Sequence, residues 1–326
     1  MTPTRPDRFA PFVATLGRGP GRSRALTREE ARDAFALVLA GQVDPVQLGA
    51  FLMLLRYRGE DAAEIAGLVE AAQGAAGRID AGAMLDWPSY GAGRTRGAPW
   101  FLLAALALAR AGVRVLMHGT NDFSAGVSVA EGLAALGLTP ARDAAAAAEG
   151  LARDRFAYLP LAALAPELDR LLGLRRLFGV RSPVNTVVRL LDPARAPAGV
   201  DGVFHPAYLD VHLDVAARLG RSRLLVLKGG GGEAELIPVK PAVAHLWSAG
   251  AGRSVLDLPA WPGLGGTAAP ETDPAALAAV WRGETAPARP VATVQATIAL
   301  GLLALGSAGT AATAAQEAAR IWAARH

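Results

Sequence analysis

The chain has 326 residues, of which 52% are hydrophobic, so it can form one large or two ordinary domains and is not a disordered protein. It contains no cysteine, which excludes structural disulfides, a catalytic thiol and a cysteine-ligated metal. The formal net charge is +4, and Lys228 and Lys240 are the only lysines. Arginine suits phosphate recognition because its planar fork donates two hydrogen bonds to one anion, although a GC-rich coding bias would give the same composition.

Neither end of the chain predicts a membrane segment. The N-terminal residues lack an apolar signal core, so we expect a cytoplasmic protein with no membrane partner. Residues 290–316 carry no charge and are long enough to span a bilayer, but threonine, glutamine, serine and glycine residues interrupt them. A turn at Gly306–Gly309 between two buried helices fits this stretch better.

The N-terminal segment 8–24 begins with a short apolar helix pattern and continues into glycines and arginines. Two interpretations remain open for Arg18, Arg22 and Arg24. They belong either to a solvated connector or to a flexible basic arm that follows a polyanion.

Three helices in tandem follow this segment. Thr27 and Glu30 have the spacing of a capping box, and the first helix ends at Gly41. Asp44-Pro45 and Asp61 are start signals for helices that run to about residues 57 and 73. The sequence therefore predicts a small all-helical N-terminal domain over 8–78, with a contribution from roughly 160–182.

The stretch 86–120 combines a glycine turn, an apolar helix and a strand. Gly91 and Gly93 permit an unusual backbone path, a helix is expected over 98–110, and a strand over 113–117 ends at His118-Gly119. Free N–H groups at a helix start beside strand ends attract anions. The stretch predicts an anion-binding site, and a plain glycine turn before a core helix is the alternative.

Strand and helix patterns alternate through the rest of the chain. Strands are expected at 113–117, 200–204 and 224–227, and helices at 129–136, 168–178 and 209–219. The strand at 224–227 continues into Lys228 and four glycines, which permit close approach of a ligand to the backbone. This alternation predicts a larger α/β domain over 80–326, with a mostly parallel sheet flanked by helices.

Several motifs in order resemble the anthranilate phosphoribosyltransferase superfamily, which has the glycosyltransferase family 3 fold. They are the tandem helices, the glycine turn, the strand ending in His-Gly, the segment VRSPVN and the loop VLKGGGGE. The resemblance implies a helical domain joined to an α/β domain and a homodimer formed through the helical domain. It also implies binding of phosphoribosyl pyrophosphate with magnesium between the domains.

The motifs depart from the family pattern at the positions that carry its chemistry. The family's GTGGD falls at residues 89–93, where the acidic residue is absent and Arg94 follows. Its KHGN becomes residues 117–120 without the lysine and the asparagine. Its magnesium pair becomes Ala234-Glu235, whereas the substrate-binding arginine persists as Arg175. We therefore expect phosphate to be held by cationic side chains without a metal.

Within the superfamily, the pattern is similar to the YbiB-type branch, which binds nucleic acids. This resemblance implies sequence-independent binding of DNA or RNA through a basic groove at the former phosphoribosyl pyrophosphate cleft, with no catalytic residue, cofactor or metal. The predicted nucleic-acid or phosphate-binding residues are Arg18, Arg22, Arg24, Gly91, Gly93, Arg94, Arg96, His118, Gly119, Arg175, Arg181, Lys228 and Lys240.

Two alternatives stay open. The first is a phosphoribosyltransferase with an altered substrate, which would use phosphoribosyl pyrophosphate and magnesium with Glu235 as a metal ligand, and which Ser124 and Arg175 favour. The second is an interaction scaffold that uses the helical unit only to dimerise. Each basic residue is by itself compatible with an ordinary solvated surface charge.

Overall fold

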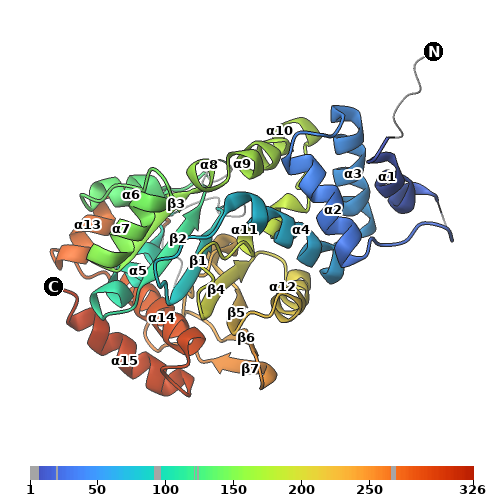
Figure 1. The fold of residues 1–326 in the computed structure, drawn as a ribbon. Coiled ribbons are helices and arrows are strands. Elements are labelled where there is room, and N and C mark those ends of the chain that lie inside the picture. Colours follow the sequence, from blue (N-terminus) through green and yellow to red (C-terminus); the bar gives the residue numbers. More distant parts are fainter. Residues whose placement is uncertain (1–6, 20, 92–96, 121, 123–124, 266–268) are drawn as a thin grey trace, which may run out of the picture.

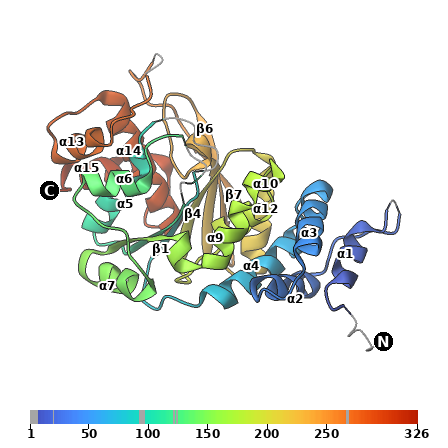
Figure 2. The ribbon, with the colours of Figure 1, turned by 90° about the horizontal axis from the view of Figure 1, so that it is seen from above.

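A computed structural model describes residues 7–19, 21–91, 97–120, 122, 125–265 and 269–326. It has a helical unit at the end that carries the N-terminus and an α/β unit at the end that carries the C-terminus (Figure 1). Figure 2 shows the helical unit to one side of the sheet, with α9 and α10 between the two. The small helical domain and the larger α/β domain expected from the sequence are confirmed.

The helical unit consists of α1 (Ala10–Gly17), α2 (Arg28–Leu39), α3 (Pro45–Arg58) and α4 (Ala62–Ala76). The capping box is present, because Thr27 accepts a hydrogen bond from the N–H of Glu30 and the Glu30 side chain accepts one from the N–H of Thr27. Asp44 and Asp61 cap α3 and α4 through their side chains. The three predicted helix starts are therefore confirmed.

The α/β unit contains a sheet of seven strands in the order β3-β2-β1-β4-β5-β6-β7. Their bounds are β1 (Leu85–Ser89), β2 (Val115–Gly119), β3 (Phe156–Pro160), β4 (Ala198–Val203), β5 (Arg223–Lys228), β6 (Ala242–Ser248) and β7 (Gly252–Leu258). The first five strands pair in parallel, and β6 and β7 add an antiparallel hairpin at one edge. The mostly parallel sheet is therefore confirmed.

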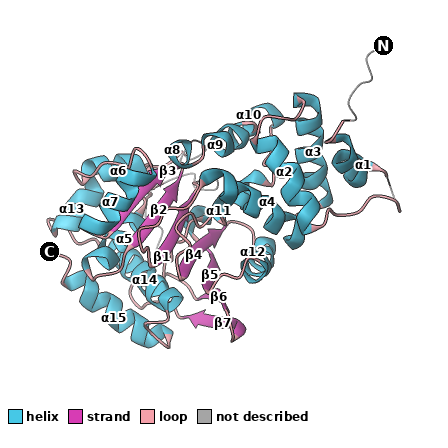
Figure 3. Ribbon diagram, viewed as in Figure 1, coloured by secondary structure: helices cyan, strands magenta, loops and turns pink. Residues whose placement is uncertain are grey.

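Helices cover both faces of the sheet (Figure 3). The helices that follow β1 along the chain are α5 (Trp100–Arg110), α6 (Val129–Ala135), α7 (Ala144–Asp154), α8 (Leu161–Leu164), α9 (Pro166–Gly173), α10 (Arg175–Phe178), α11 (Val184–Arg189), α12 (Ala207–Arg218), α13 (Ala275–Arg282), α14 (Ala288–Leu305) and α15 (Ala311–Ala323). A short 3₁₀ turn occupies Gly230–Gly232. The helix expected over 168–178 is divided between α9 and α10 at Leu174.

Alternate residues of the strands belong to two separate hydrophobic cores. In β2, Leu116 packs into the core shared with α4, α11 and α12, whereas Val115 and Met117 pack into the core shared with α5, α14 and α15. This alternation follows from the two-residue repeat of a strand. Because both faces are covered, the three central parallel strands β1, β2 and β4 are buried along their length.

One described helix, α14, is long and apolar enough to cross a membrane by length and composition, and 67% of its apolar window is buried inside the protein. It is a core helix that packs against the sheet, α5 and α15. The turn expected at Gly306–Gly309 separates α14 from α15.

Two sequence predictions need correction around the glycine turn. Strand β1 occupies Leu85–Ser89, where a turn was expected from Asp86 onward. Strand β2 runs over Val115–Gly119, so His118 and Gly119 belong to the strand instead of following it. A Cβ atom on Gly119 would lie 1.6 Å from the carbonyl oxygen of Ser89, so glycine is required for the two strands to lie this close.

Candidate functional site

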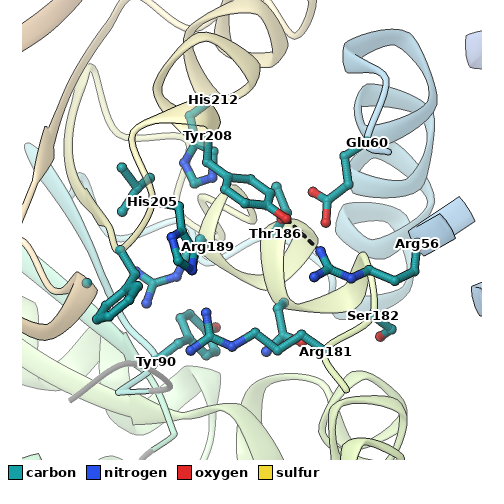
Figure 4. Close-up of a pocket in the computed structure, with 14 residues that line it drawn as sticks. Arg56, Glu60, Tyr90, Arg181, Ser182, Thr186, Arg189, His205, Tyr208 and His212 are labelled. Carbon is teal, nitrogen blue, oxygen red and sulfur yellow. Dashed lines mark hydrogen bonds between the residues drawn. The ribbon is translucent and has the colours of Figure 1, made fainter. Parts of the chain in front are cut away.

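A pocket lies beyond the carboxyl ends of β1 and β4, between the sheet and the helical unit (Figure 4). The empty space in it, including solvent at its mouth, amounts to about 550 Å³. Arg56 of α3 lines it from the helical unit, Tyr90 follows β1, Phe204 follows β4, and Tyr208 comes from α12. Ligands of open α/β sheets bind at this edge, so we call this space the interdomain pocket.

Three arginines from separate elements line the interdomain pocket. Arg56 Nη1 donates a hydrogen bond to Tyr208 Oη at 2.8 Å, as drawn in Figure 4. Arg189 Nη1 donates to the carbonyl oxygen of Gly202 at 2.9 Å. Burial, together with the like charges of Arg175 and Arg189, lowers the pKa of Arg181. An anion bound here would offset this excess of positive charge.

Acidic and aromatic groups complete the lining. Burial raises the pKa of the Glu60 carboxyl, although Thr186, His212 and Arg56 oppose the effect. Burial also raises the pKa of Tyr208. The raised pKa means that Glu60 holds its proton at a higher pH than an ordinary glutamate does.

Asp201 fixes two of the lining side chains. Its Oδ2 atom lies 2.6 Å from His212 Nδ1, and its Oδ1 atom lies 3.2 Å from Arg189 Nη1. Asp201 and His212 are almost completely buried. The carboxylate therefore orients both an imidazole and a guanidinium toward the same side of the pocket.

A second buried network connects the wall of the pocket to the centre of the sheet. Tyr90 Oη lies 2.8 Å from His118 Nδ1, and His118 Nε2 lies 3.2 Å from Asp86 Oδ1. Arg221 Nη2 donates to Asp86 Oδ2 at 3.0 Å. Burial disfavours the Asp86 carboxylate, but His118 and Arg221 outweigh it and the pKa of Asp86 is lowered. The Nε2–H group of His118 donates a hydrogen bond to the ionised Asp86, so Nδ1 of a neutral His118 accepts one from the Tyr90 hydroxyl.

The four-glycine loop directs two carboxylates toward the glycine turn. Glu233 Oε1 accepts a hydrogen bond from the N–H of Gly91, and Glu235 Oε2 accepts one from the N–H of Phe101, near the start of α5, at 3.1 Å. Both side chains are buried. A Cβ atom on Gly202 would lie 2.1 Å from the backbone of Glu233, so glycine there lets the loop rest directly on β4.

These contacts decide whether the described residues fit a magnesium ion. Glu233 and Glu235 each give an oxygen to a backbone donor. Among the described residues, no three side chains of aspartate, glutamate, histidine or cysteine converge on a point that could hold a metal. The described residues therefore do not form an all-protein cage for magnesium, an ion that usually binds one or two carboxylates together with substrate phosphates.

Comparison with known proteins agrees with this architecture. Residues 11–76 match the helical bundle domain of the glycosyl transferase family, and residues 101–323 match its a/b domain. Anthranilate phosphoribosyltransferase of Beijerinckia indica is 32% identical over 90% of this chain and 87% of its own length. That of Methylobacterium nodulans is 34% identical over 90% and 88%.

The chain belongs to the anthranilate phosphoribosyltransferase superfamily. The crystal structure of the enzyme from Thermus thermophilus superposes with a TM-score of 0.79 at 25% identity, covering 98% of this chain and 95% of that one. The Saccharomyces cerevisiae enzyme in complex with PRPP and Mg has a TM-score of 0.79 at 14% identity, covering 97% and 94%, and this likeness shows the shared fold alone.

The structure describes most of the residues that the sequence predicted to bind nucleic acid or phosphate. They do not all lie at the interdomain pocket. The glycines and the arm arginines are not among its lining residues, whereas Arg181 is. The arm lies at the outer end of the helical unit beside α1 (Figure 1), where Arg24 pairs with Glu30 at 2.6 Å. Lys228, the last residue of β5, and Lys240, which lies between β5 and β6, are both exposed. Gly93, Arg94, Arg96 and Ser124 lie outside the described residues.

His118 needs a correction of its role. A direct contact with phosphate was expected, but its side chain is 0% exposed and both ring nitrogens have partners within the protein. It acts on the pocket only through Tyr90.

Sequence reasoning missed several residues that the fold brings to the site. They are Arg56, Glu60, Arg189, Asp201, Tyr208, His212 and Glu233. The four-residue spacing of Tyr208 and His212 on one helix face was a usable signal. The position of Glu233 directly after the glycines was another.

Proposed function

We propose that this protein is a phosphoribosyltransferase-type enzyme whose donor phosphates are bound by arginines and whose acceptor differs from anthranilate. The observation that carries this proposal is the interdomain pocket, where Arg56, Arg181 and Arg189 surround one space beside Tyr90. Support also comes from the superfamily relatives, which are named anthranilate phosphoribosyltransferases.

The chemistry of glycosyl transfer agrees with these residues. Departure of a phosphate-bearing group leaves negative charge, and preorganised cations stabilise that charge in a water-poor site. Arg181, whose pKa burial and neighbouring arginines lower, is the cation that gains most from an incoming anion. Glu60, with a raised pKa, is the carboxyl group placed to take a proton from the acceptor. In this proposal the arginines, and not a metal ion, hold the donor phosphates.

Calorimetric titration with phosphoribosyl pyrophosphate tests the donor site. We expect binding that is equal with and without Mg²⁺, and a loss of about ten-fold to a hundred-fold in affinity in Arg181→Met, because a charge-assisted hydrogen bond contributes about 1.5–3 kcal/mol. Arg32→Met, on the exposed face of α2, is the matched control and should bind like the wild type. Unchanged affinity in Arg181→Met, or binding that requires Mg²⁺, would contradict the proposal.

A second candidate function is sequence-independent nucleic-acid binding, as expected for the YbiB-type branch. The exposure of Lys228 and Lys240 beside the loop favours it, as does the outward position of Arg18 and Arg22. Gel shifts with single-stranded DNA and RNA at about 50 mM and about 300 mM salt test it, because phosphate contacts make affinity fall steeply with salt. Absent or salt-independent binding would exclude it.

We also propose that the helical unit forms a homodimer. Val46 and Tyr57 of α3 and Leu177 of α10 are 81%, 91% and 82% exposed, which is unusual for large apolar side chains. Light scattering on Tyr57→Glu should show a shift toward monomer. Val255→Glu, at an exposed position on β7, is the control and should leave the mass unchanged.

A further inference from the structure

A second depression lies at the other end of the parallel strands. It is lined by the end of α5, the connection between α6 and α7, α7 itself, the start of β3 and Trp281 of α13. The empty space in it, including the solvent above it, amounts to about 1810 Å³. Figure 1 shows α5, α6, α7 and α13 gathered at this end of the molecule, away from the helical unit. We call this depression the arginine groove.

Small residues form part of the lining of the arginine groove. Ala109, Ala146, Gly150 and Ala157 lie along it. A Cβ atom on Gly150 would be 3.2 Å from the carbonyl oxygen of Phe156, so α7 lies directly on β3 there. Larger apolar groups also line the groove, and they are Leu136, Leu138 and Trp281. An aromatic or aliphatic body can pack against these side chains, and we call the space beside them the slot.

Four arginines from three parts of the chain contribute to the lining of the groove. Arg142 and Arg153 pair with their chain neighbours, Asp143 at 3.3 Å and Asp154 at 2.7 Å. The other two are Arg110, at the end of α5, and Arg155, after α7. Within the ranges that the structure describes, neither of these two guanidinium groups forms a hydrogen bond or an ion pair. The groove therefore has four arginines against two lining carboxylates, Glu149 and Asp154, and two of its cations lie beside apolar side chains without a partner in the described ranges.

The backbone at Arg155 gives an independent indication that its side chain is used. Arg155 ends α7 with φ 59° and ψ 13°, in the left-handed region that disfavours side chains. Three other helices, α10, α13 and α14, end in the same conformation, and each has glycine there. Retaining arginine where glycine is the better residue costs stability, and such strain is concentrated at functional sites.

We propose that the arginine groove binds a small organic anion that has an aromatic or aliphatic body. The body lies in the slot against Trp281 and Leu138, and a carboxylate, sulfonate or phosphate group pairs with Arg110 and Arg155. This site shares no residue with the interdomain pocket and does not depend on the function proposed above.

The test uses anilinonaphthalene sulfonate, a flat aromatic anion whose fluorescence increases in apolar surroundings. We expect saturable binding to the full-length protein and a loss of about ten-fold or more in affinity in Arg155→Gly combined with Arg110→Ala. Arg155→Gly relieves backbone strain, so a folding defect does not explain the loss. Arg195→Gly is the matched control, because Arg195 also has a positive φ, of 52°, but lies outside the groove.

Hydrogen exchange with the same probe locates the site. Protection of peptides within 136–158 supports the proposal. Displacement of the probe by dodecanoate or by phenyl phosphate also supports it. The more effective competitor shows whether the natural ligand is an aliphatic carboxylate or an aromatic phosphate. Unchanged affinity in the double variant, equal loss in Arg195→Gly, or protection confined to residues 181–189 would overturn it.

Discussion

Glu64 holds the segment between α1 and α2 onto the helical unit, and this contact should depend on pH. Its side chain is 2% exposed and its Oε1 atom accepts the N–H of Leu26 at 2.6 Å. Burial raises the pKa of Glu64 from 4.5 to about 7, although the hydrogen bond from Leu26 opposes the effect. The folded state therefore binds this proton more tightly than the unfolded chain does. The contribution of Glu64 to the free energy of unfolding is therefore largest below pH 4.5 and declines as the pH rises to about 7.

The size of the effect follows from the difference between the two pKa values. A shift from 4.5 to about 7 corresponds to about 3 kcal/mol of unfolding free energy. In Glu64→Gln the amide oxygen still accepts from Leu26 but does not titrate. We therefore expect the variant to gain about 3 kcal/mol relative to the wild type between about pH 4.5 and about pH 8.

Urea denaturation followed by far-ultraviolet circular dichroism measures this difference across the pH range. Glu29→Gln, at an exposed position on α2, is the matched control and should follow the wild-type profile. If Glu64→Gln and the wild type lose stability in parallel as the pH rises, the buried carboxyl does not titrate as the structure implies.

Three further substitutions test the core of the site. Tyr90→Phe removes the hydrogen bond to His118 and should cost about 1–3 kcal/mol in urea denaturation; unchanged stability would mean that this hydrogen bond does not stabilise the fold. Arg221→Met leaves its buried carboxylate partners without their cation and should cost about 3–5 kcal/mol by the same measurement; a cost below about 1 kcal/mol would mean that the pairing is not required. Gly119→Ala forces a Cβ atom to within 1.6 Å of a carbonyl oxygen of β1 and should give no soluble folded protein, whereas Gly74→Ala on α4 meets nothing within 4 Å and should fold normally.

Local signals explain why much of the fold is predictable from the sequence. The capping box of Thr27 and Glu30 acts within one helical turn, and so do the caps at Asp44 and Asp61. Strand β1 is different, because Pro88 normally argues against a central strand. It is tolerated because β1 pairs with β4 only through Leu85 and Asp86, so no second strand needs the missing N–H of Pro88.

The site was less predictable because its partners are far apart in the sequence. The contact between Gly91 and Glu233 spans 142 residues, and the contact between Arg221 and Asp86 spans 135. No periodic pattern reports such pairs. Sequence motifs located the glycine turn and the glycine loop, but not that the carboxylates of the loop occupy the backbone donors at the turn and at the start of α5. That arrangement depends on the close packing of the loop on Gly202.

Helix α5 has a mechanical consequence for the whole α/β unit. Its residues from Phe101 to Ala109 are all buried, and its length is about 16 Å at 1.5 Å per residue. One end holds Glu235 through the N–H of Phe101, and the other end carries Arg110 into the arginine groove. A close-packed helix of this kind does not bend easily, so a displacement of one end moves the other end as well. Helix α5 therefore connects the two ends of the sheet mechanically.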